Sequence, residues 1–252
     1  MTEKLNILIT GASSGIGEAL SQYYAEHGAE NLFISGRNAE RLHKVAELCR
    51  QKGINVFEKQ INVDNRSEMA EWIEACNRQA ALNIVYANAG ISTGEETTEN
   101  AYNTFSTNVM GVLNTIHPAI DIFKQRPNGT KAIVITSSIA GYHGLPACPS
   151  YSASKACVKA YGEALRGSLK PFGIQVNVVC PGFVKSRITD KNTCPMPFFM
   201  SAEKAAEIIA NGVENNTGLI AFPWPMRFGV WFLSILPNCL SQYIYNALPH
   251  KV

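Results

Sequence analysis

Two side chains with complementary acid–base chemistry stand four positions apart in the sequence, Tyr151 and Lys155. Residues four apart lie on the same face of a helix, so a helix here would bring the phenol and the ammonium together. A free phenol has a pKa of about 10 and supplies little phenolate at neutral pH. A neighbouring ammonium favours the phenolate and lowers that pKa. The spacing therefore predicts that Tyr151 is a general acid/base that works at physiological pH.

A hydroxyl group precedes this pair. Ser138 lies 13 residues before Tyr151 and directly follows an apolar run. In that position its hydroxyl would hold a substrate oxygen beside the phenol. It would equally serve as a simple cap at the end of a strand, and the residues alone leave both interpretations open.

A glycine-rich segment near the N-terminus predicts a dinucleotide site. Gly11, Gly15 and Gly17 span the junction between the first apolar run and the first predicted helix. Gly11 permits a tight turn, Gly15 lets the backbone approach a ligand, and Gly17 lets the helix pack close to the sheet. The helix N-terminus offers unpaired N–H groups and partial positive charge to a pyrophosphate. A plain glycine-rich turn with a capping serine is the alternative, but the position between strand and helix favours the dinucleotide.

The end of the second apolar run bears on which dinucleotide binds. NAD sites usually carry an acid about 20 residues after the glycine segment, for the ribose 2′-OH. Here the run ends in Ser35-Gly36-Arg37-Asn38, without an acid. The Arg37 guanidinium would instead meet a 2′-phosphate through a planar, charge-assisted fork. Alternatively, Arg37 is a solvated residue that opens the next helix. We predict NADP(H) as the preferred cofactor, with NAD(H) as the alternative.

Short apolar runs alternate with longer segments of helical character. The predicted strands are Leu5–Thr10, Asn31–Ser35, Asn55–Ile61, Asn83–Ala87, Ala132–Ser137, Gln175–Val179 and Leu219–Phe222. The predicted helices lie near residues 15–28, 38–52, 67–80, 98–124, 150–171 and 201–214. Continuous apolar runs indicate strands that are buried on both faces by helices. We therefore predict an α/β fold, a Rossmann-like, doubly wound parallel sheet of about seven strands in a three-layer sandwich, with function in the loops that follow the strands.

Composition excludes several classes of protein. The 252 residues are 46% hydrophobic and 17% charged, with 22 Lys and Arg against 20 Asp and Glu. This balance argues against disorder and against a nucleic-acid partner. The seven cysteines form no Cys-x-x-Cys pair, which predicts reduced thiols and neither a metal site nor a disulfide framework. No secretory signal is visible, so we expect a cytoplasmic protein, with contact at a membrane periphery as the alternative.

The motifs together resemble those of the short-chain dehydrogenase/reductases in their compact form of about 250 residues. The resemblance spans Leu5 to about Phe222. It rests on these motifs: Thr10-Gly11-x-x-x-Gly15-Ile16-Gly17, Asn88-Ala89-Gly90, Asn108, Ser138, Tyr151-x-x-x-Lys155 and Pro181-Gly182. All of them occur in the family's order and spacing. Residues 1–222 are thus expected to form one NAD(P)-binding domain that includes the catalytic residues.

The resemblance implies a role for each motif. Tyr151 would exchange a proton with the substrate oxygen, Ser138 would position that oxygen, Lys155 would hold the nicotinamide ribose and lower the Tyr151 pKa, and Asn108 would bind a water of a proton relay. Asn88, Ala89 and Gly90 would shape the sheet edge, and Val184 would dock the carboxamide. The implied cofactor-binding residues are Gly11, Ser13, Ser14, Gly15, Ile16, Gly17, Arg37, Asn62, Val63, Asn88, Ala89, Gly90, Tyr151, Lys155, Pro181, Gly182 and Val184.

Two positions depart from the family pattern. The family often has Asp-Val after the third strand, where this sequence has Asn62-Val63 with Asp64 next. Asn62 would still pair with the adenine amino group. NADP-binding members often have a second basic residue before the middle glycine, where this sequence has Ser14. Arg37 would then act nearly alone on a 2′-phosphate.

The C-terminal segment, residues 223–252, is predicted as an apolar extension and not an independent domain. Arg227 is the only charged residue between Leu219 and His250, and Pro223, Pro225 and Pro237 are expected to be breaks. The segment would pack on a partner subunit, cover the substrate pocket, lie in a membrane interface or complete the core. The apolar run from Phe228 to Leu236 is too short to span a bilayer.

These features predict an NADP(H)-dependent oxidoreductase that interconverts a carbonyl and an alcohol on an apolar small molecule, without a metal. A homodimer or homotetramer is expected. The alternatives are a membrane-peripheral lipid or hydroxysteroid dehydrogenase and a non-catalytic dinucleotide-binding protein. The Met and Phe residues between Met196 and Met200 would suit an apolar substrate or ordinary packing.

Overall fold

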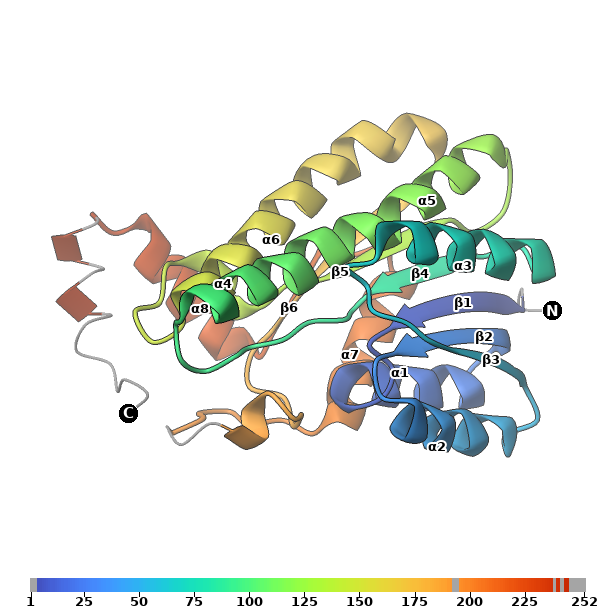
Figure 1. Cartoon of the computed structure of the whole chain (residues 1–252). Coiled ribbons are helices and arrows are strands. Elements are labelled where there is room, and N and C mark those ends of the chain that lie inside the picture. The colour runs from blue at the N-terminus through green and yellow to red at the C-terminus, as the bar shows by residue number, and fades with distance from the viewer. Residues whose placement is uncertain (1–3, 192–194, 238, 241–242, 245–252) are drawn as a thin grey trace.

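The computed structural model of the chain describes residues 4–191, 195–237, 239–240 and 243–244, and shows a central sheet between two layers of helices (Figure 1). All strand pairs are parallel. The strands are β1 (Leu5–Thr10), β2 (Ala29–Gly36), β3 (Asn55–Gln60), β4 (Ile84–Ala87), β5 (Ala132–Thr136), β6 (Gln175–Pro181) and β7 (Leu219–Phe222), in the order β3-β2-β1-β4-β5-β6-β7. The predicted Rossmann-like architecture is confirmed.

Helices cover both faces of this sheet. One layer holds α1 (Gly15–Glu26), α2 (Ala39–Arg50) and α7 (Ala202–Glu214), and the other α3 (Arg66–Gln79), α5 (Gly111–Gln125) and α6 (Pro149–Leu169) (Figure 1). Each layer packs its own apolar cluster against the strands, through Leu20 and Leu42 on one face and Ile73 and Ile116 on the other. The central strands are mostly apolar, with few of the alternating polar residues of a one-sided sheet, because both faces are covered.

The predicted helix over residues 98–124 is divided. It comprises α4 (Thr98–Phe105), one π-helical turn at Ser106–Met110 (η1) and then α5. A π-helical turn carries extra backbone in a single turn and often occurs at functional sites. Short 3₁₀ helices also occur at Ile139–Tyr142 (η2), Lys170–Phe172 (η3) and Thr189–Lys191 (η4).

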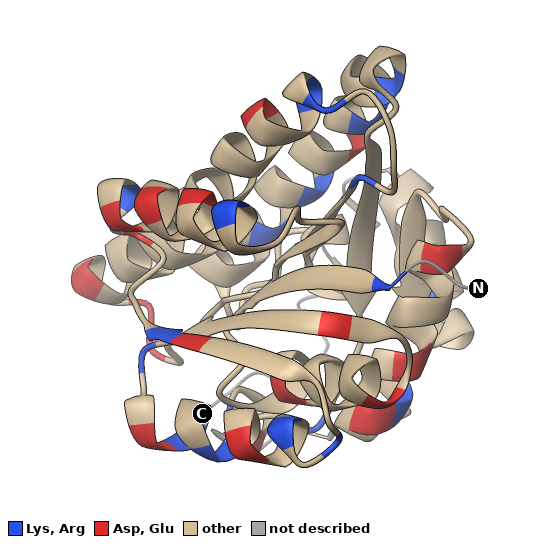
Figure 2. Cartoon of the chain, turned by 90° about the vertical axis from the view of Figure 1, so that its right-hand side faces the viewer, with Lys and Arg blue, Asp and Glu red and all other residues tan. Residues whose placement is uncertain are grey.

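The order of the strands reverses at β1, which lies between β2 and β4. In an open α/β sheet this arrangement leaves a crevice at the carboxyl ends of the strands, where ligands bind. The loops after β1, β4, β5 and β6 carry the residues singled out by the sequence. Figure 2 shows that charged residues belong mostly to the outer helices and loops, and that few belong to the strands.

The C-terminal segment forms a helix that the sequence analysis did not predict. This helix, α8, runs from Trp224 to Ile235. The prolines had been interpreted as breaks, and that was wrong for Pro225 alone, because Pro223 and Pro237 flank the helix at its two ends. Pro223 is the N-cap and Pro225 lies in the first turn, where an N–H has no helical partner, while Pro237 follows the end. Residues 238, 241–242 and 245–252 of the predicted extension lie outside the described residues.

Candidate active site

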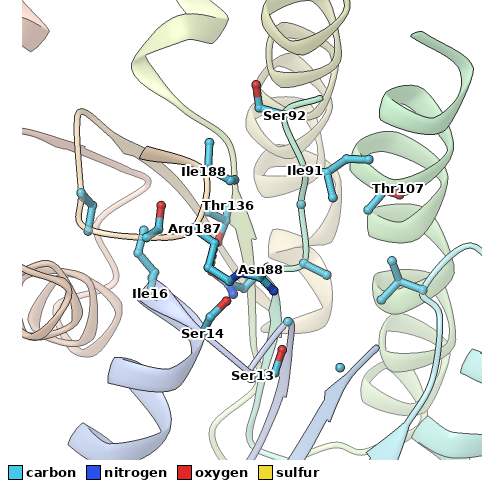
Figure 3. Close-up of a pocket in the computed structure, with 18 of the residues that line it drawn as sticks. Ser13, Ser14, Ile16, Asn88, Ile91, Ser92, Thr107, Thr136, Arg187 and Ile188 are labelled. Carbon is cyan, nitrogen blue, oxygen red and sulfur yellow. Dashed lines mark hydrogen bonds between the residues drawn. The ribbon is translucent and has the colours of Figure 1, made fainter. Parts of the chain in front are cut away.

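A cavity of about 340 Å³ lies at the carboxyl ends of the strands (Figure 3). It contains nearly all of the residues predicted from the sequence. Those that line it are Gly11, Ser13, Ser14, Gly15, Ile16, Arg37, Asn62, Val63, Asn88, Ala89, Gly90, Ser138, Tyr151, Lys155, Pro181, Gly182 and Val184. Two predicted residues do not line it, Gly17 and Asn108. Both lie behind its wall.

The glycine segment turns tightly between β1 and α1. Gly11 has φ +68°, and a Cβ there would lie 2.7 Å from the Ala89 Cα, so the turn both needs a left-handed residue and contacts the loop after β4. Ser14, the N-cap residue of α1, makes no capping bond with its side chain. The first amides of α1 therefore face the cavity as donors for an anion.

Thr10 and Asn88 join β1 to β4 beneath this turn. The Thr10 hydroxyl donates to the Tyr86 carbonyl at 3.1 Å and accepts from the Asn88 and Ala89 amides at 3.0 and 3.2 Å. The Asn88 side-chain amide donates to the Thr10 carbonyl at 3.1 Å. This network fixes the floor of the cavity at the reversal of strand order. The structural role of Thr10 had not been predicted.

The structure brings Ser138, Tyr151 and Lys155 together. Tyr151 and Lys155 lie in the first turns of α6, and Ser138 follows β5. The Ser138 side chain is hydrogen-bonded to the Tyr151 phenol and also accepts from the Ala140 amide at 3.1 Å. Ser138 is thus both the cap of η2 and a partner of the phenol. The two interpretations that the sequence left open are compatible.

Lys155 is held from the sheet. Its Nζ donates to the Thr136 carbonyl at 2.8 Å and lies 5.8 Å from the centre of the Tyr151 ring, and the residue is 3% exposed. This burial lowers the pKa of Lys155 to about 8, because a charged amine loses solvation in the interior. The ammonium therefore loses its proton far more readily than an exposed lysine.

The pKa of Tyr151 shifts in the direction opposite to the sequence prediction. Burial raises it to about 12, and the Ser138 hydrogen bond only partly opposes that rise. Desolvation penalises the phenolate more than the surroundings stabilise it. The chain therefore keeps Tyr151 as a neutral phenol at physiological pH, which is the state that donates a proton.

Asn108 lies in the π-helical turn and is fully buried. Its Oδ1 accepts from the Ile91 amide at 2.8 Å, and its Nδ2 donates to the Ile91 carbonyl at 2.9 Å and to the Ser154 hydroxyl at 3.0 Å. Asn108 therefore connects the loop after β4 to α6. Its predicted part in a water relay stays a prediction.

The cavity wall is cationic. Arg37, Arg41, Lys155 and Arg187 line it, and none of its lining residues is an Asp or a Glu. The Arg41 Nε is buried without a hydrogen-bond partner in the described structure. Arg41, in the first turn of α2, lines the same cavity as Arg37 and offers a second guanidinium there, while the expectation that Arg37 acts nearly alone on a 2′-phosphate stays a prediction. Arg187 extends from the loop after β6 toward Asn88 and Ser14 (Figure 3).

Sequence reasoning missed several other lining residues. They are Gly36, Asn38, Ile61, Ile91, Ser92, Thr107, Thr136, Ser137, Ser186, Ile188 and Thr189. Most of them are sequence neighbours of predicted residues, so the predicted motifs were one or two residues too short. The segment Ser186–Thr189 is different. It crosses the glycine segment so closely that a Cβ on Gly15 would lie 2.9 Å from the Ser186 Cβ, and no pattern had indicated that contact.

The family assignment follows from comparison with known sequences. A family profile described as "short chain dehydrogenase" matches residues 5–195. This chain belongs to the short-chain dehydrogenase family. It is an oxidoreductase of that family, as its motifs indicate. It is 33% identical over 238 residues to an "Uncharacterized oxidoreductase" of Myxococcus xanthus, and the aligned region covers 92% of this chain and 93% of the relative.

Other members are similar over comparable lengths. An "11-beta-hydroxysteroid dehydrogenase-like 4A" of Arabidopsis thaliana is 31% identical, with 95% of this chain and 84% of the relative covered. Two solved structures share the fold. One is a short chain dehydrogenase/reductase from Burkholderia phymatum in complex with NAD, with 21% identity and a TM-score of 0.83 over 99% of this chain and 98% of that one. The other is a short-chain dehydrogenase from Sphingobium yanoikuyae in complex with NADPH, with 24% identity and a TM-score of 0.79 over 97% of this chain and 96% of that one.

The donor set of the cavity fits a dinucleotide. The amides at the start of α1 match a pyrophosphate, and the unpartnered Arg41 Nε offers a donor at the Arg37 end of the cavity. Within the described residues, no three His, Cys, Asp or Glu side chains gather as a metal site.

Proposed function

We propose that this short-chain dehydrogenase is an NADP(H)-dependent oxidoreductase that interconverts a carbonyl and an alcohol on an apolar small molecule. The observation that carries the proposal is that the dinucleotide cradle and the Ser138–Tyr151–Lys155 group line one cavity. When bound, the cofactor supplies or accepts the hydride at its nicotinamide ring.

The chain's own residues bind, orient and exchange the proton. The glycine segment and the start of α1 hold the pyrophosphate, Asn62 and Val63 flank the adenine, and Lys155 holds the ribose beside Tyr151. The Ser138 hydroxyl positions the substrate oxygen next to the phenol. Tyr151 then gives its proton to that oxygen during reduction, or takes it during oxidation.

Four cations and no acid in the cavity support the preference for NADP(H), because a 2′-phosphate adds up to two negative charges. Charge-assisted hydrogen bonds contribute roughly 1.5–3 kcal/mol, which is about 10- to 150-fold in Kd. We expect Arg37→Gln and Arg41→Gln each to weaken NADPH binding by such a factor and to leave NADH binding within about twofold.

Fluorescence titration with both cofactors measures this preference. Lys44→Gln is the matched control. Lys44 lies on α2, as Arg41 does, but it pairs with Glu40 at 2.7 Å at the surface. Equal affinity of the unaltered protein for NADH and NADPH would remove the case for NADP(H).

Turnover separates the enzyme from a dinucleotide-binding protein without activity. A panel of apolar ketones and aldehydes with NADPH should include a substrate, and Tyr151→Phe should reduce its kcat by at least 100-fold, since general acid catalysis contributes about 10²–10⁴. If no carbonyl is reduced and NADPH still binds, the non-catalytic alternative is favoured.

One observation favours contact with a membrane or with an apolar partner. Trp224, Phe228, Trp231, Phe232 and Ile235 are spaced as one stripe of α8 and are 47–76% exposed. No described helix is long and apolar enough to cross a bilayer. We propose a peripheral lipid or hydroxysteroid dehydrogenase as the second candidate function.

Flotation with phosphatidylcholine vesicles tests it. The unaltered protein should float, and Trp231→Glu should not, while Phe172→Glu, which changes an exposed aromatic residue far from α8 in the sequence, should behave like the unaltered protein. If the unaltered protein and both variants all stay at the bottom of the gradient, away from the vesicles, membrane contact is rejected.

We also propose a cytoplasmic protein that forms a homodimer or homotetramer. Exposed apolar side chains outside α8, such as Tyr102, Phe105 and Met110 on α4 and η1, support self-association. Light scattering at micromolar concentration gives the mass, and the mass of a monomer contradicts this part of the proposal.

A further inference from the structure

Both ends of the loop between β4 and α4 are tied down by side chains. The part of this loop from residue 91 to residue 97 contributes Ile91 and Ser92 to the cavity. Its first residue, Ile91, is held by Asn108 through two hydrogen bonds. Its other end is held by Glu96, which reaches the start of α6.

Glu96 contacts α6 with both carboxylate oxygens. Its Oε1 accepts from the Ser150 amide at 3.0 Å, and its Oε2 accepts from the Ser150 hydroxyl at 2.9 Å. Ser150 is only 5% exposed. The contact spans 54 residues of sequence, and it reaches the residue immediately before Tyr151.

This contact replaces a local cap. Cys148, the N-cap residue of α6, makes no capping bond with its side chain, and the helix begins with Pro149. The amides of a first helical turn lack helical partners, and a carboxylate is favoured beside them by the helix dipole. Glu96 therefore supplies from a distant loop what other helices take from their own N-cap, as α2 does from Asn38.

The register of α6 couples this cap to the chemistry. Ser150 and Ser154 are four residues apart and form one row, while Tyr151 and Lys155 form the adjacent row. Glu96 binds Ser150, and Asn108 binds Ser154. Glu96 of the loop and Asn108 of η1 thus hold one row of the helix at two successive turns, and the other row carries the phenol and the ammonium.

We propose that Glu96 is a positioning residue, which sets the place of Tyr151 relative to Ser138 by capping α6 through Ser150. The inference rests on the proposed role of Tyr151 in proton transfer. The competing explanation is a cap that only adds stability. The positioning role and the purely stabilising role predict different results. A displaced phenol slows turnover but leaves the affinity for the cofactor unchanged, since Glu96 does not line the cavity.

Glu96→Gln tests the proposal. The amide keeps the size of the side chain, removes its charge and leaves one oxygen as the acceptor for the Ser150 amide, so the Ser150 hydroxyl must turn from donor to acceptor. Glu95→Gln is the matched control, because it removes the same charge from the neighbouring exposed position. With NADPH and 4-nitrobenzaldehyde, we expect the kcat of Glu96→Gln to fall at least tenfold, with the Kd for NADPH within twofold, and the control to match the unaltered protein. Glu96→Asp should recover part of the kcat.

Ser150→Ala completes a double-mutant cycle. Once Ser150→Ala has removed one of the two bonds, adding Glu96→Gln should cost less than it does alone, since both changes act on the same contact. Independent effects on kcat, or a kcat of Glu96→Gln within twofold of the unaltered protein, overturn the proposal.

A second readout needs no turnover. Ultraviolet difference titration against Tyr151→Phe follows the phenol directly. Burial holds the pKa of Tyr151 high, so a displaced phenol should titrate closer to the value of about 10 for a free one. If the unaltered protein reduces no carbonyl, the proposed function fails, and this titration still decides the place of Glu96. An unchanged titration in Glu96→Gln overturns the inference.

Discussion

Gly17→Ala should damage the cofactor site although alanine favours helices. A Cβ at this position would lie 2.4 Å from the Gly11 carbonyl oxygen and 2.7 Å from the Asn88 Nδ2, whereas ordinary contacts lie at 3.4–4 Å. One of the groups must therefore move by about 1 Å. Neither is the end of a flexible chain, since Gly11 belongs to the tight turn and the Asn88 amide donates to the Thr10 carbonyl.

The cost follows from that displacement. Overpacking a close contact costs roughly 1–3 kcal/mol of stability, against at most about 1 kcal/mol that alanine adds in a helix. A shift of about 1 Å at a positioned group costs on the order of 10²-fold in function. We expect Gly17→Ala to bind NADPH on the order of 10²-fold more weakly, with a lower midpoint of urea unfolding.

Fluorescence titration and urea unfolding measure the two effects, with Gly144→Ala as the control because a Cβ at Gly144 meets nothing within 4 Å. If Gly17→Ala binds NADPH within threefold of the unaltered protein and unfolds at the same urea concentration, the steric argument is refuted.

Three further predictions concern stability. Gly167→Ala, at an exposed position of α6 with open space around it, should raise the free energy of unfolding by about 0.5–1 kcal/mol. A lower free energy of unfolding in urea would contradict this. Lys131→Met should lower it by about 1.5–3 kcal/mol, because the buried Lys131 Nζ donates to the Arg126 and Phe172 carbonyls at 2.8 and 2.7 Å; an unchanged unfolding midpoint would show that these bonds contribute nothing. Lys155 has a folded pKa of about 8, below its unfolded value of 10.5, so the unfolded state binds more protons between these values and stability rises with pH there. The unfolding free energy of the unaltered protein relative to Lys155→Met should therefore grow from pH 8 to 10, and a flat or falling difference would reject the shift.

The sheet was predictable because its strands are buried on both faces. β1 and β7 match their predicted ends, since each apolar run stops at a Gly or a Pro. The π-helical turn was not predictable, because one wider turn hardly changes the spacing of apolar residues. α8 was missed for a different reason. Its prolines occupy positions where a helix loses no hydrogen bond, and only the helix itself shows which positions those are.

The same distinction applies to the candidate site. Residues within two positions of a strand's carboxyl end, such as Gly11, Asn88 and Ser138, were found because the parallel sheet brings all strand ends to one edge. Arg41 and Glu96 were missed, because their places depend on the direction in which α2 starts and on the path of a loop. Neither has a signature of its own in the sequence.

Burial acts on Tyr151 and Lys155 in opposite directions, and this bears on the proposed chemistry. Free in water, the two groups titrate close together, near 10 and 10.5. In the cavity, burial raises the pKa of Tyr151 to about 12 and lowers that of Lys155 to about 8. The neutral pair is thus favoured over the phenolate–ammonium pair that the sequence alone suggested. Reduction needs a protonated phenol, which the chain already provides at physiological pH. Oxidation needs the phenolate, which the same burial makes about 100-fold scarcer than for a free tyrosine. Burial thus leaves the phenol protonated, as a free tyrosine already is at pH 7, but it also makes the phenol a weaker acid, so the pKa shift by itself favours neither direction of the reaction.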